Sequence, residues 1–186
     1  MKTVVSKISR TLAVTREYLR LKDYQQSLGE GLQFDLLGPE HTESILKWRN
    51  DKETIGAFAT TGGLSRKAHE QFLATYEVQD RIDLVLVDEY TNTPIGVFYL
   101  TGVSSTNPQI GKFIGEKRYR GKGLAKLATQ ALVRFAFDHL QLVELYARTR
   151  KDNQKNILLN QALGFRSESV AESSNGTFVI MKLQRS

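Results

Sequence analysis

Three β-rich segments follow one another in the middle of the chain, and they limit the fold more than any other feature of the sequence. Residues 81–89, 94–103 and 109–116 are rich in β-branched and aromatic residues, and turn-forming residues separate them. Such a run is typical of strands that meander through one sheet. The centre of the fold is therefore predicted to be a sheet.

A long amphipathic helix is predicted directly after the third segment. Beyond Gly123, apolar residues recur at the i, i+3, i+4, i+7 spacing of a helix for about four turns. These residues are Leu124, Leu127, Ala128, Ala131, Leu132, Phe135, Ala136 and Leu140. Residues 142–149 then return to a strand pattern.

The last part of the chain is predicted to form a helix and a hairpin. Residues 152–165 have the helical pattern, with Asp152 or Asn153 as the N-cap and Gly164 as the C-terminal stop. The two strands of the hairpin are predicted over residues 169–173 and 177–183.

One strand and two helices are predicted before the β-rich segments. The strand covers residues 33–37, and the helices cover 38–51 and 64–77, with Ser65 as the N-cap of the second. Strands in a meander followed by strand–helix–strand–helix predict a mixed α/β fold. We expect a central mixed sheet of about seven strands with helices on both faces.

The length of 186 residues suits one domain with a real core. No apolar run approaches the roughly 20 residues that a membrane span needs. The absence of cysteine excludes disulfides, a cysteine nucleophile and cysteine-ligated zinc. We expect no metal site and a cytoplasmic location.

The positive charge is concentrated at the N-terminus. Six basic residues and one acidic residue give residues 1–22 a net charge of +5, out of +6 for the whole chain. The body of the protein therefore lacks the basic surface of a nucleic-acid-binding protein, and no nucleic-acid partner is expected.

Residues 1–30 are predicted to be a basic, helical arm, and residues 31–186 to be the domain. Residues 27–33 resemble a linker, since two glycines and a serine interrupt the helical pattern. Apolar residues lie near one helical face of the arm, namely Val5, Ile8, Leu12 and Leu19. Three interpretations stay open: a helix docked on the domain, a basic helix for an anionic membrane surface or a partner, and an organelle transit peptide.

The segment 115–123 is predicted to bind an anion. It leaves a strand and opens the long helix, so unpaired N–H groups and the positive helix end converge there. Gly121 and Gly123 let the backbone approach a ligand closely. Basic charge is added by Arg118, Arg120 and Lys122. A phosphate or pyrophosphate is the expected ligand, and a flexible loop beside a solvated basic face is the alternative.

Two common phosphate-binding loops do not fit this segment. A P-loop needs four residues between its glycines and a serine or threonine after its lysine. Here five residues separate Gly115 from Gly121, and Gly123 follows Lys122. The dinucleotide fingerprint needs a third glycine where Lys126 stands.

Two motifs together give the chain a family resemblance. Arg118-x-x-Gly121-x-Gly123 matches the acetyl-CoA signature [QR]-x-x-G-x-[GA], and residues 153–165 match N-x-x-[SAN]-x-x-L-x-x-x-L-G-F. Over roughly residues 33–183 the chain resembles the GCN5-related N-acetyltransferase (GNAT) superfamily. The resemblance implies an acetyl-CoA-dependent N-acetyltransferase.

The resemblance also implies where acetyl-CoA binds. Its pyrophosphate would lie on the amides of residues 120–125, and its pantetheine arm would run between two splayed parallel strands. The helix that begins near Asn153 would add a further contact, although Asn153 also suits a simple N-cap. The implied cofactor-binding residues are Phe113, Ile114, Gly115, Arg118, Arg120, Gly121, Lys122, Gly123, Leu124, Ala125, Asn153 and Asn156.

Acetyl transfer needs a base for the amine, a donor for the oxyanion and a proton for the thiolate. His69, Glu116 and Asp51 are the candidate bases, and His69 has the most suitable ordinary pKa, about 6.5. By resemblance, the strand backbone near Phe113 is the oxyanion donor. The role of acid is less demanding, because a thiol with a pKa of about 8.5 leaves readily.

The acid is the point at which the sequence departs from many relatives. They carry a tyrosine where this chain has Asn160, and an amide cannot donate a proton as a phenol does. Asn160 could orient the thiol, and Tyr146 or a bound water could act instead. A catalytically silent acyl-CoA-binding module is the corresponding alternative for the whole protein.

Two segments point to the acceptor. Residues 45–51 and 64–72 resemble the W-R-N-D and S-x-x-x-H-x-x-[WF] segments of a subgroup. That subgroup includes enzymes that acetylate an amino sugar on a nucleotide carrier, and the ribosomal-protein N-terminal acetyltransferases share part of the pattern. By resemblance, the acceptor side is formed by Trp48, Arg49, Asn50 and His69.

The preferred acceptor is therefore a small-molecule amine, a nucleotide-linked amino sugar used in surface glycan biosynthesis. Arg49 would pair with a phosphate of this substrate. A protein N-terminal amine is the alternative acceptor, and a core anchor is the alternative role of Trp48. Peripheral membrane contact through the arm and a homodimer also stay open.

Overall fold

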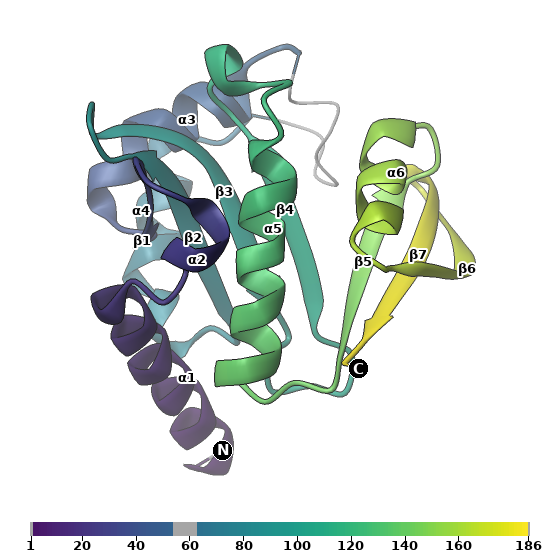
Figure 1. Ribbon diagram of the computed structural model, residues 1–186, viewed down its shortest axis with the longest axis horizontal. Helices are drawn as coiled ribbons and strands as arrows, with labels where there is room; N and C mark the ends of the chain where they lie inside the picture. Colours follow the sequence, from purple (N-terminus) through teal and green to yellow (C-terminus); the bar gives the residue numbers. More distant parts are fainter. Residues whose placement is uncertain (1, 54–62, 186) are drawn as a thin grey trace.

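A seven-stranded mixed sheet forms the centre of the protein (Figure 1). The computed structural model describes residues 2–53 and 63–185. The strand order is β1-β2-β3-β4-β5-β7-β6, and all neighbours are antiparallel except β4 and β5, which are parallel. The strands are β1 (Leu32–Leu36), β2 (Arg81–Asp88), β3 (Thr93–Thr101), β4 (Gln109–Ile114), β5 (Glu144–Arg150), β6 (Arg166–Ser173) and β7 (Gly176–Gln184).

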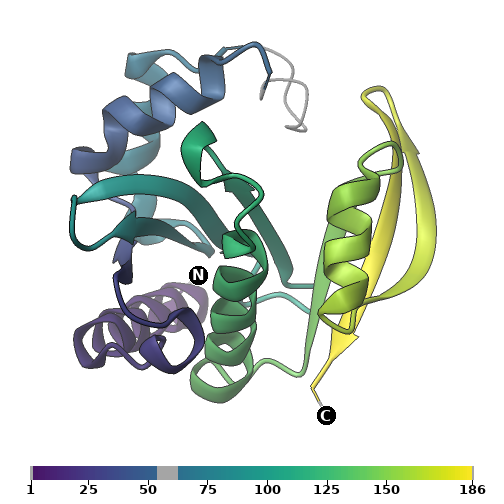
Figure 2. The same ribbon diagram turned by 45° about the horizontal axis from the view of Figure 1, so that its top comes forward.

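Helices cover both faces of this sheet, and the predicted fold class is confirmed. The helices are α1 (Lys2–Leu21), α2 (Gln25–Leu28), α3 (Thr42–Asn50), α4 (Arg66–Ala74), α5 (Leu124–Arg134) and α6 (Gln154–Ala162). Strands β2 and β3 lie between the α3–α4 pair and the group formed by α1, α2 and α5 (Figure 2).

Side chains that alternate along the strands pack into two separate hydrophobic cores, one on each face of the sheet. On β2, Leu84 and Leu86 belong to the larger core, which includes side chains of α5, whereas Val85 belongs to a smaller core with Ile45 and Trp48 of α3. Successive side chains of a strand point to opposite faces, so one apolar strand supplies both cores. The side of the sheet with the larger core is the α5 face, and the side with the smaller core is the α3–α4 face.

Two predicted caps are settled by single hydrogen bonds. The Ser65 hydroxyl accepts a bond from the Ala68 N–H at 3.2 Å, which confirms Ser65 as the N-cap of α4. The N-cap of α6 is Asn153, whose side chain accepts from the Asn156 N–H at 3.2 Å. Asp152 pairs with Arg150 instead.

In three of the predicted helices the α-helical part is shorter than expected, because one end is a 3₁₀ or π-helical turn. A 3₁₀ turn over Pro39–His41 precedes α3, and another over Tyr76–Val78 follows α4. The long helix leaves the α form at Arg134 and continues as a π-helical turn, Phe135–His139. The chain then turns at Gln141, which has a positive φ of 56°.

The arm packs on the domain through its helix α1. Leu12, Thr15 and Tyr18 are buried, and the Tyr18 ring lies 4.4 Å from that of Phe135. The predicted linker 27–33 is wrong at both ends, since α2 extends to Leu28 and β1 begins at Leu32. The side chains of Val5 and Ile8 lie outside the described residues. In the described part of the chain, no helix is both long enough and apolar enough to cross a membrane.

Candidate active site

The two parallel strands β4 and β5 diverge from a single point of contact. Gln109 pairs with Tyr146, and the Tyr146 N–H donates to the Pro108 carbonyl at 2.9 Å. No later pair joins the two strands within the described residues, and their ribbons separate beyond this point (Figure 1). The edge of β4 from Gly111 to Ile114 therefore faces β5 without a ladder, which suits an extended ligand.

The glycine loop lies between the end of β4 and the start of α5. Gly121 and Gly123 have φ values of +76° and +77°, and a Cβ at either would meet no atom within 4 Å. Among the described residues, no acceptor bonds the backbone N–H groups of residues 121–125. This is the open set of amides at a helix start that an anion needs.

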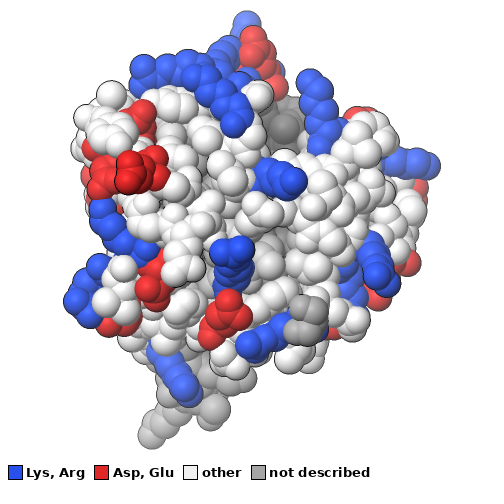
Figure 3. Space-filling model, in the orientation of Figure 1, with Lys and Arg blue, Asp and Glu red and all other residues white. Residues whose placement is uncertain are grey.

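The predicted basic residues differ in what they do. Arg120 donates to the carbonyls of Ile114 at 3.2 Å and Gly115 at 3.1 Å, so it ties the loop to the end of β4. Arg118 and Lys122 lie over the Tyr119 ring, at 5.0 and 5.4 Å from its centroid. Figure 3 shows Lys and Arg side chains gathered around this end of the molecule. Arg120 has a structural role as well as a charge, which the pattern alone does not reveal.

Trp48 is a core residue behind the end of β4. Its exposed fraction is 2%, and its ring meets that of Phe113 edge-on at 5.9 Å. A Cβ at Gly115 would lie 2.0 Å from the indole. The alternative role of Trp48, a core anchor, therefore describes its position better than an acceptor contact does.

Arg49 and Asn50 lie at the end of α3 and differ in their partners. Arg49 is half-buried near Tyr99, and burial lowers the pKa of its guanidinium. The Asn50 side chain donates to the Leu64 carbonyl at 3.0 Å and accepts from the Leu64 N–H at 2.8 Å. Asn50 thus holds the chain before α4, and Arg49 is the charged residue of the two.

His69 is buried on α4 beside Phe72, with 6.3 Å between the ring centroids. Its Nε2 atom has no hydrogen-bond partner within the described part of the chain. Burial lowers the pKa of the imidazole, which favours the neutral form that can accept a proton. His69 therefore keeps the properties of a base.

The other two candidate bases are engaged in ion pairs. Glu116 pairs with Lys47 at 2.9 Å. Asp51 accepts from the Glu53 N–H at 2.8 Å and pairs with Lys117 at 3.1 Å, and these contacts lower its pKa. A carboxylate with a lowered pKa is a weak base.

Asn160 belongs to a buried polar network on the α5 face. Its Nδ2 atom donates to the Thr149 hydroxyl at 3.2 Å, and its Oδ1 atom accepts from Lys112 Nζ at 2.6 Å. Asn156 donates to the same Thr149 hydroxyl at 3.0 Å. The side chains of Asn153 and Asn156 are therefore engaged within the chain, as an N-cap and in this network.

Lys112 is the residue that sequence reasoning missed. It lies on β4 between Ile110 and Ile114, which share its face of the strand and pack in or against the larger core. Burial lowers the pKa of its ammonium to about 8. A lysine at an apolar position of an alternating strand was the available signal.

Tyr146 lies on the other face of β5 from this network. Leu145, Ala147 and Thr149 are buried on the α5 face, so Tyr146 points away from Asn160. Its hydroxyl donates to Glu144 at 2.9 Å. The expectation that Tyr146 could stand in for an acid at Asn160 is thus not supported by its position.

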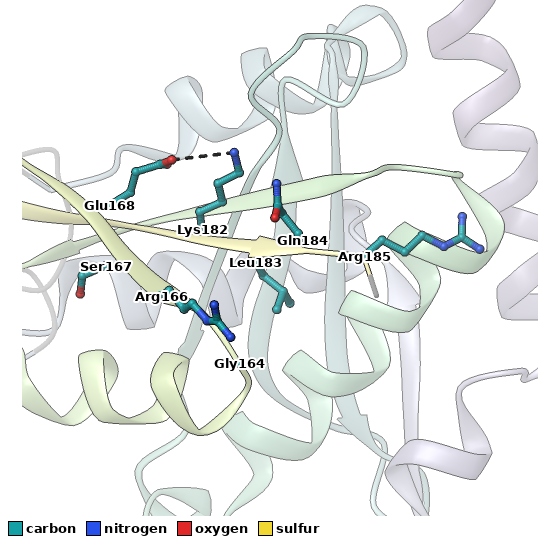
Figure 4. A pocket seen from close by; sticks show the side chains of 8 residues that line it. All are labelled: Gly164, Arg166, Ser167, Glu168, Lys182, Leu183, Gln184 and Arg185. Carbon is teal, nitrogen blue, oxygen red and sulfur yellow. Dashed lines mark ion pairs between the residues drawn. The ribbon is translucent and has the colours of Figure 1, made fainter.

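A hollow of ≈ 500 Å³ lies at the far edge of the sheet, on β6 and β7 (Figure 4). Figure 4 shows Lys182 turned towards Glu168, and their ion pair is 3.8 Å long. None of the residues predicted to bind a ligand lines this hollow.

Comparison of the sequence with known proteins gives one family match and two similar proteins. The family model described as "Acetyltransferase (GNAT) domain" matches residues 32–166. An N-acetyltransferase 9-like protein of Caenorhabditis briggsae is 26% identical over 150 residues, which cover 73% of this chain and 74% of the relative. Acetyltransferase PseH of Campylobacter jejuni is 27% identical over 130 residues, which cover 69% and 78%.

Solved structures show the same fold. Spermidine N-acetyltransferase from Vibrio cholerae, in complex with CoA and spermine, has a TM-score of 0.75 at 18% identity and covers 84% of this chain and 96% of its own. Ribosomal-protein-S5-alanine acetyltransferase from Vibrio fischeri has a TM-score of 0.71 at 19% identity, covering 83% and 93%.

Proposed function

Because the chain belongs to the GNAT acetyltransferase family, we propose that its acceptor is a nucleotide-linked amino sugar, used in surface glycan biosynthesis. The transfer of an acetyl group from acetyl-CoA follows from the family itself. The chain is therefore an acetyl-CoA-dependent N-acetyltransferase, and the silent binding module is set aside. The acceptor and the roles of individual residues are the proposal.

The open amides of residues 121–125 support the proposed position of acetyl-CoA. They would bind its pyrophosphate at the start of α5, where the helix dipole favours negative charge. The pantetheine arm would then follow the edge of β4 that faces β5, where no ladder joins the two strands beyond Gln109 within the described residues. Acetyl-CoA supplies the activated acetyl group, and the protein positions it between β4 and β5.

The charge of Arg49 on the α3–α4 face is the observation that carries the proposed acceptor. Phe113 of β4 and Tyr99 of β3 belong to this face, and Arg49 lies close to Tyr99. A half-buried guanidinium binds phosphate oxygens more strongly than an exposed one, because water screens it less. The similarity to acetyltransferase PseH and the resemblance of residues 45–51 and 64–72 to the amino-sugar subgroup agree with this assignment.

His69 is the proposed base on the same face. An amine must lose a proton as it attacks the thioester, and a buried neutral imidazole can accept one. The backbone of β4 near Phe113 is the proposed donor to the oxyanion. Acceptor and base would thus lie on the α3–α4 face.

The test is CoA thiol release with a panel of amines. The panel contains a nucleotide-linked amino sugar, the same sugar without the nucleotide, spermidine and a ribosomal-protein N-terminal peptide. We expect the highest kcat/KM with the nucleotide-linked sugar. A preference for the peptide would support the alternative acceptor and contradict the proposal.

Arg49→Leu tests the phosphate contact, and Arg66→Leu is its matched control. Arg66 is an exposed arginine on α4 that pairs with Glu43. We expect Arg49→Leu to raise KM for the nucleotide-linked sugar by about 10-fold or more, since a charged hydrogen bond contributes about 1.5–3 kcal/mol. Arg66→Leu should leave KM unchanged. Equal effects of the two variants would contradict a specific role for Arg49.

Two further predictions concern partners. Membrane contact through α1 would use its basic residues, since Leu12 and Tyr18 are buried against the domain. Co-sedimentation with anionic vesicles tests it, and light scattering tests a homodimer.

A further inference from the structure

We propose that Lys112 is the proton donor to the departing thiolate of CoA, and that Asn160 holds its ammonium group in place. The proposal rests on the position of acetyl-CoA given above and is independent of the identity of the acceptor. It assigns the acid that the sequence left open.

Lys112 lies where an arm of acetyl-CoA along β4 would pass. The last pair between β4 and β5 is at Gln109, and Lys112 is three residues further on, where the strands have separated. An arm anchored at residues 121–125 and extended along the edge of β4 must run beside Ile114, Phe113 and Lys112 in turn.

The hydrogen bond of Lys112 crosses the gap between the two strands. Lys112 comes from β4, whereas Asn160 comes from α6, which packs beside β5. Within the described residues, no other side-chain hydrogen bond joins β4 beyond Gln109 to β5 or α6. The ammonium group therefore spans the opening into which the thioester would fit.

Among the described residues, no charged partner contributes to the pKa of Lys112, which is lowered by burial. No ion pair of Lys112 is present in the part of the chain that the structure describes, and its amide partner Asn160 is neutral. Burying a cation beside a neutral group is unfavourable. A thiolate that forms at this point would supply the missing negative charge.

Asn160 is suited to orient this lysine and unsuited to act alone. It is fully buried, its Nδ2 atom donates to Thr149, and Asn156 binds the same hydroxyl. The direction of the network leaves Oδ1 of Asn160 facing Lys112 as an acceptor. Asn160 is therefore a positioning residue, and Lys112 carries the proton.

The two faces of β4 separate the two halves of the reaction. Phe113 belongs to the α3–α4 face, on which the acceptor is proposed, whereas Lys112 turns to the α5 face. The amine would reach the carbonyl from one face of the sheet. The sulfur would leave towards the other.

The proton balance of the step is complete. The amine nitrogen bonds to the carbonyl carbon and gives one proton to the proposed base His69, and the C–S bond then breaks with its electron pair on sulfur. One N–H bond of the Lys112 ammonium gives its proton to that sulfur, which yields CoA thiol and a neutral lysine. Water returns a proton to the lysine. Because burial lowers the pKa of Lys112 to about 8, near the thiol value of about 8.5, the transfer is close to balanced.

The test uses hydroxylamine as the acceptor, because it is small and already uncharged at neutral pH, so the rate depends little on the base. CoA release is followed from neutral pH to well above pH 8 in the wild type, Lys112→Met and Lys112→Arg. The wild-type kcat should fall as pH rises through about 8, because the acid is then lost. In Lys112→Met we expect kcat at neutral pH to fall about 100-fold and the decline near pH 8 to vanish.

Lys112→Arg separates charge from proton transfer. A guanidinium stays charged throughout this range and does not give up its proton, so its profile should also lack the decline. Wild-type kcat in either variant, or a decline near pH 8 that persists in both, would overturn the proposal.

Calorimetry with CoA distinguishes this proposal from its premise. We expect Kd for CoA to change less than about threefold in Lys112→Met, because the phosphates provide most of the binding. A large loss of CoA binding with unchanged unfolding would overturn the role of Lys112 as an acid and make it a binding residue. Normal CoA binding that does not depend on Gly121 and Gly123 would instead contradict the proposed position of acetyl-CoA.

Discussion

The indole of Trp48 lies so close to the backbone of Gly115 that a single methyl group there would be 2.0 Å from the ring. Trp48 is on α3 and Gly115 directly follows β4, so the contact joins the α3–α4 face to the strand edge proposed to bind acetyl-CoA. Arg120 binds the Gly115 carbonyl at 3.1 Å from the loop side. Gly115 thus connects the core, the strand edge and the glycine loop.

Gly115→Ala should destabilise the protein, because its new methyl group overlaps a buried ring. We expect a loss of about 1–3 kcal/mol in the free energy of unfolding, measured by urea denaturation. Trp48→Phe supplies space at the same point, so Gly115→Ala should cost less in that background. Additive effects of the two substitutions would contradict the direct contact.

Gly123→Ala should weaken CoA binding. The residue has a φ of +77°, which alanine adopts at a cost of about 1 kcal/mol. Because a Cβ would meet no protein atom there, loss of CoA affinity beyond this cost would come from the ligand itself. Calorimetry with CoA measures the effect, and Gly29→Ala is the control, since that glycine has a φ of +78° and lies far from the loop in the sequence.

Ser65→Ala should destabilise α4, the helix that carries His69. The Ser65 hydroxyl satisfies the Ala68 N–H, and loss of such an N-cap costs about 1 kcal/mol. Thermal unfolding measures the change, and Lys67→Ala, an exposed position on the same helix, should have little effect. A similar loss in both variants would show that the cap contributes nothing specific.

His69→Ala should lower kcat by about 100-fold or more if the imidazole removes the proton of the amine. Burial lowers the pKa of His69 below its ordinary value of about 6.5, so the imidazole stays neutral to a more acidic pH than a free histidine does. The wild-type rate should therefore begin to fall only at more acidic pH, and His69→Ala should lack this acidic decline. With hydroxylamine, which is already neutral, the variant should lose much less.

Tyr18→Ala should show that α1 is part of the domain. Tyr18 is buried against Phe135, and truncation of a large buried aromatic residue costs about 3–5 kcal/mol. Tyr18→Phe removes only a hydroxyl whose bond to the Ala131 carbonyl is 3.4 Å long, so it should cost under about 1 kcal/mol. If Tyr18→Ala unfolds like the wild type, the arm does not contribute to the stability of the domain.

Short-range features were predictable because neighbouring residues determine them. Ser65 caps α4 through an atom three residues away, and the positive φ of Gly121 and Gly123 follows from the turn before α5. The order of strands and helices was equally readable, since hydrophobic periodicity reflects which face of each element is buried. The glycine turn before α5 was therefore predictable, whereas the bonds of Arg120 to the carbonyls of Ile114 and Gly115 were not.

The sequence by itself determined the fold class, the glycine loop at the start of α5 and the resemblance that leads to acetyl-CoA. Only the tertiary structure decided that Asn160 faces Lys112, that Tyr146 turns to the opposite face of β5 and that Asn50 binds Leu64. Lys112 and Asn160 are 48 residues apart in sequence and meet across two diverging strands. Local sequence patterns indicate which face of an element a residue occupies, but a contact between distant elements depends on how those elements pack. The proposed acid, Lys112, could therefore be identified only from the tertiary structure.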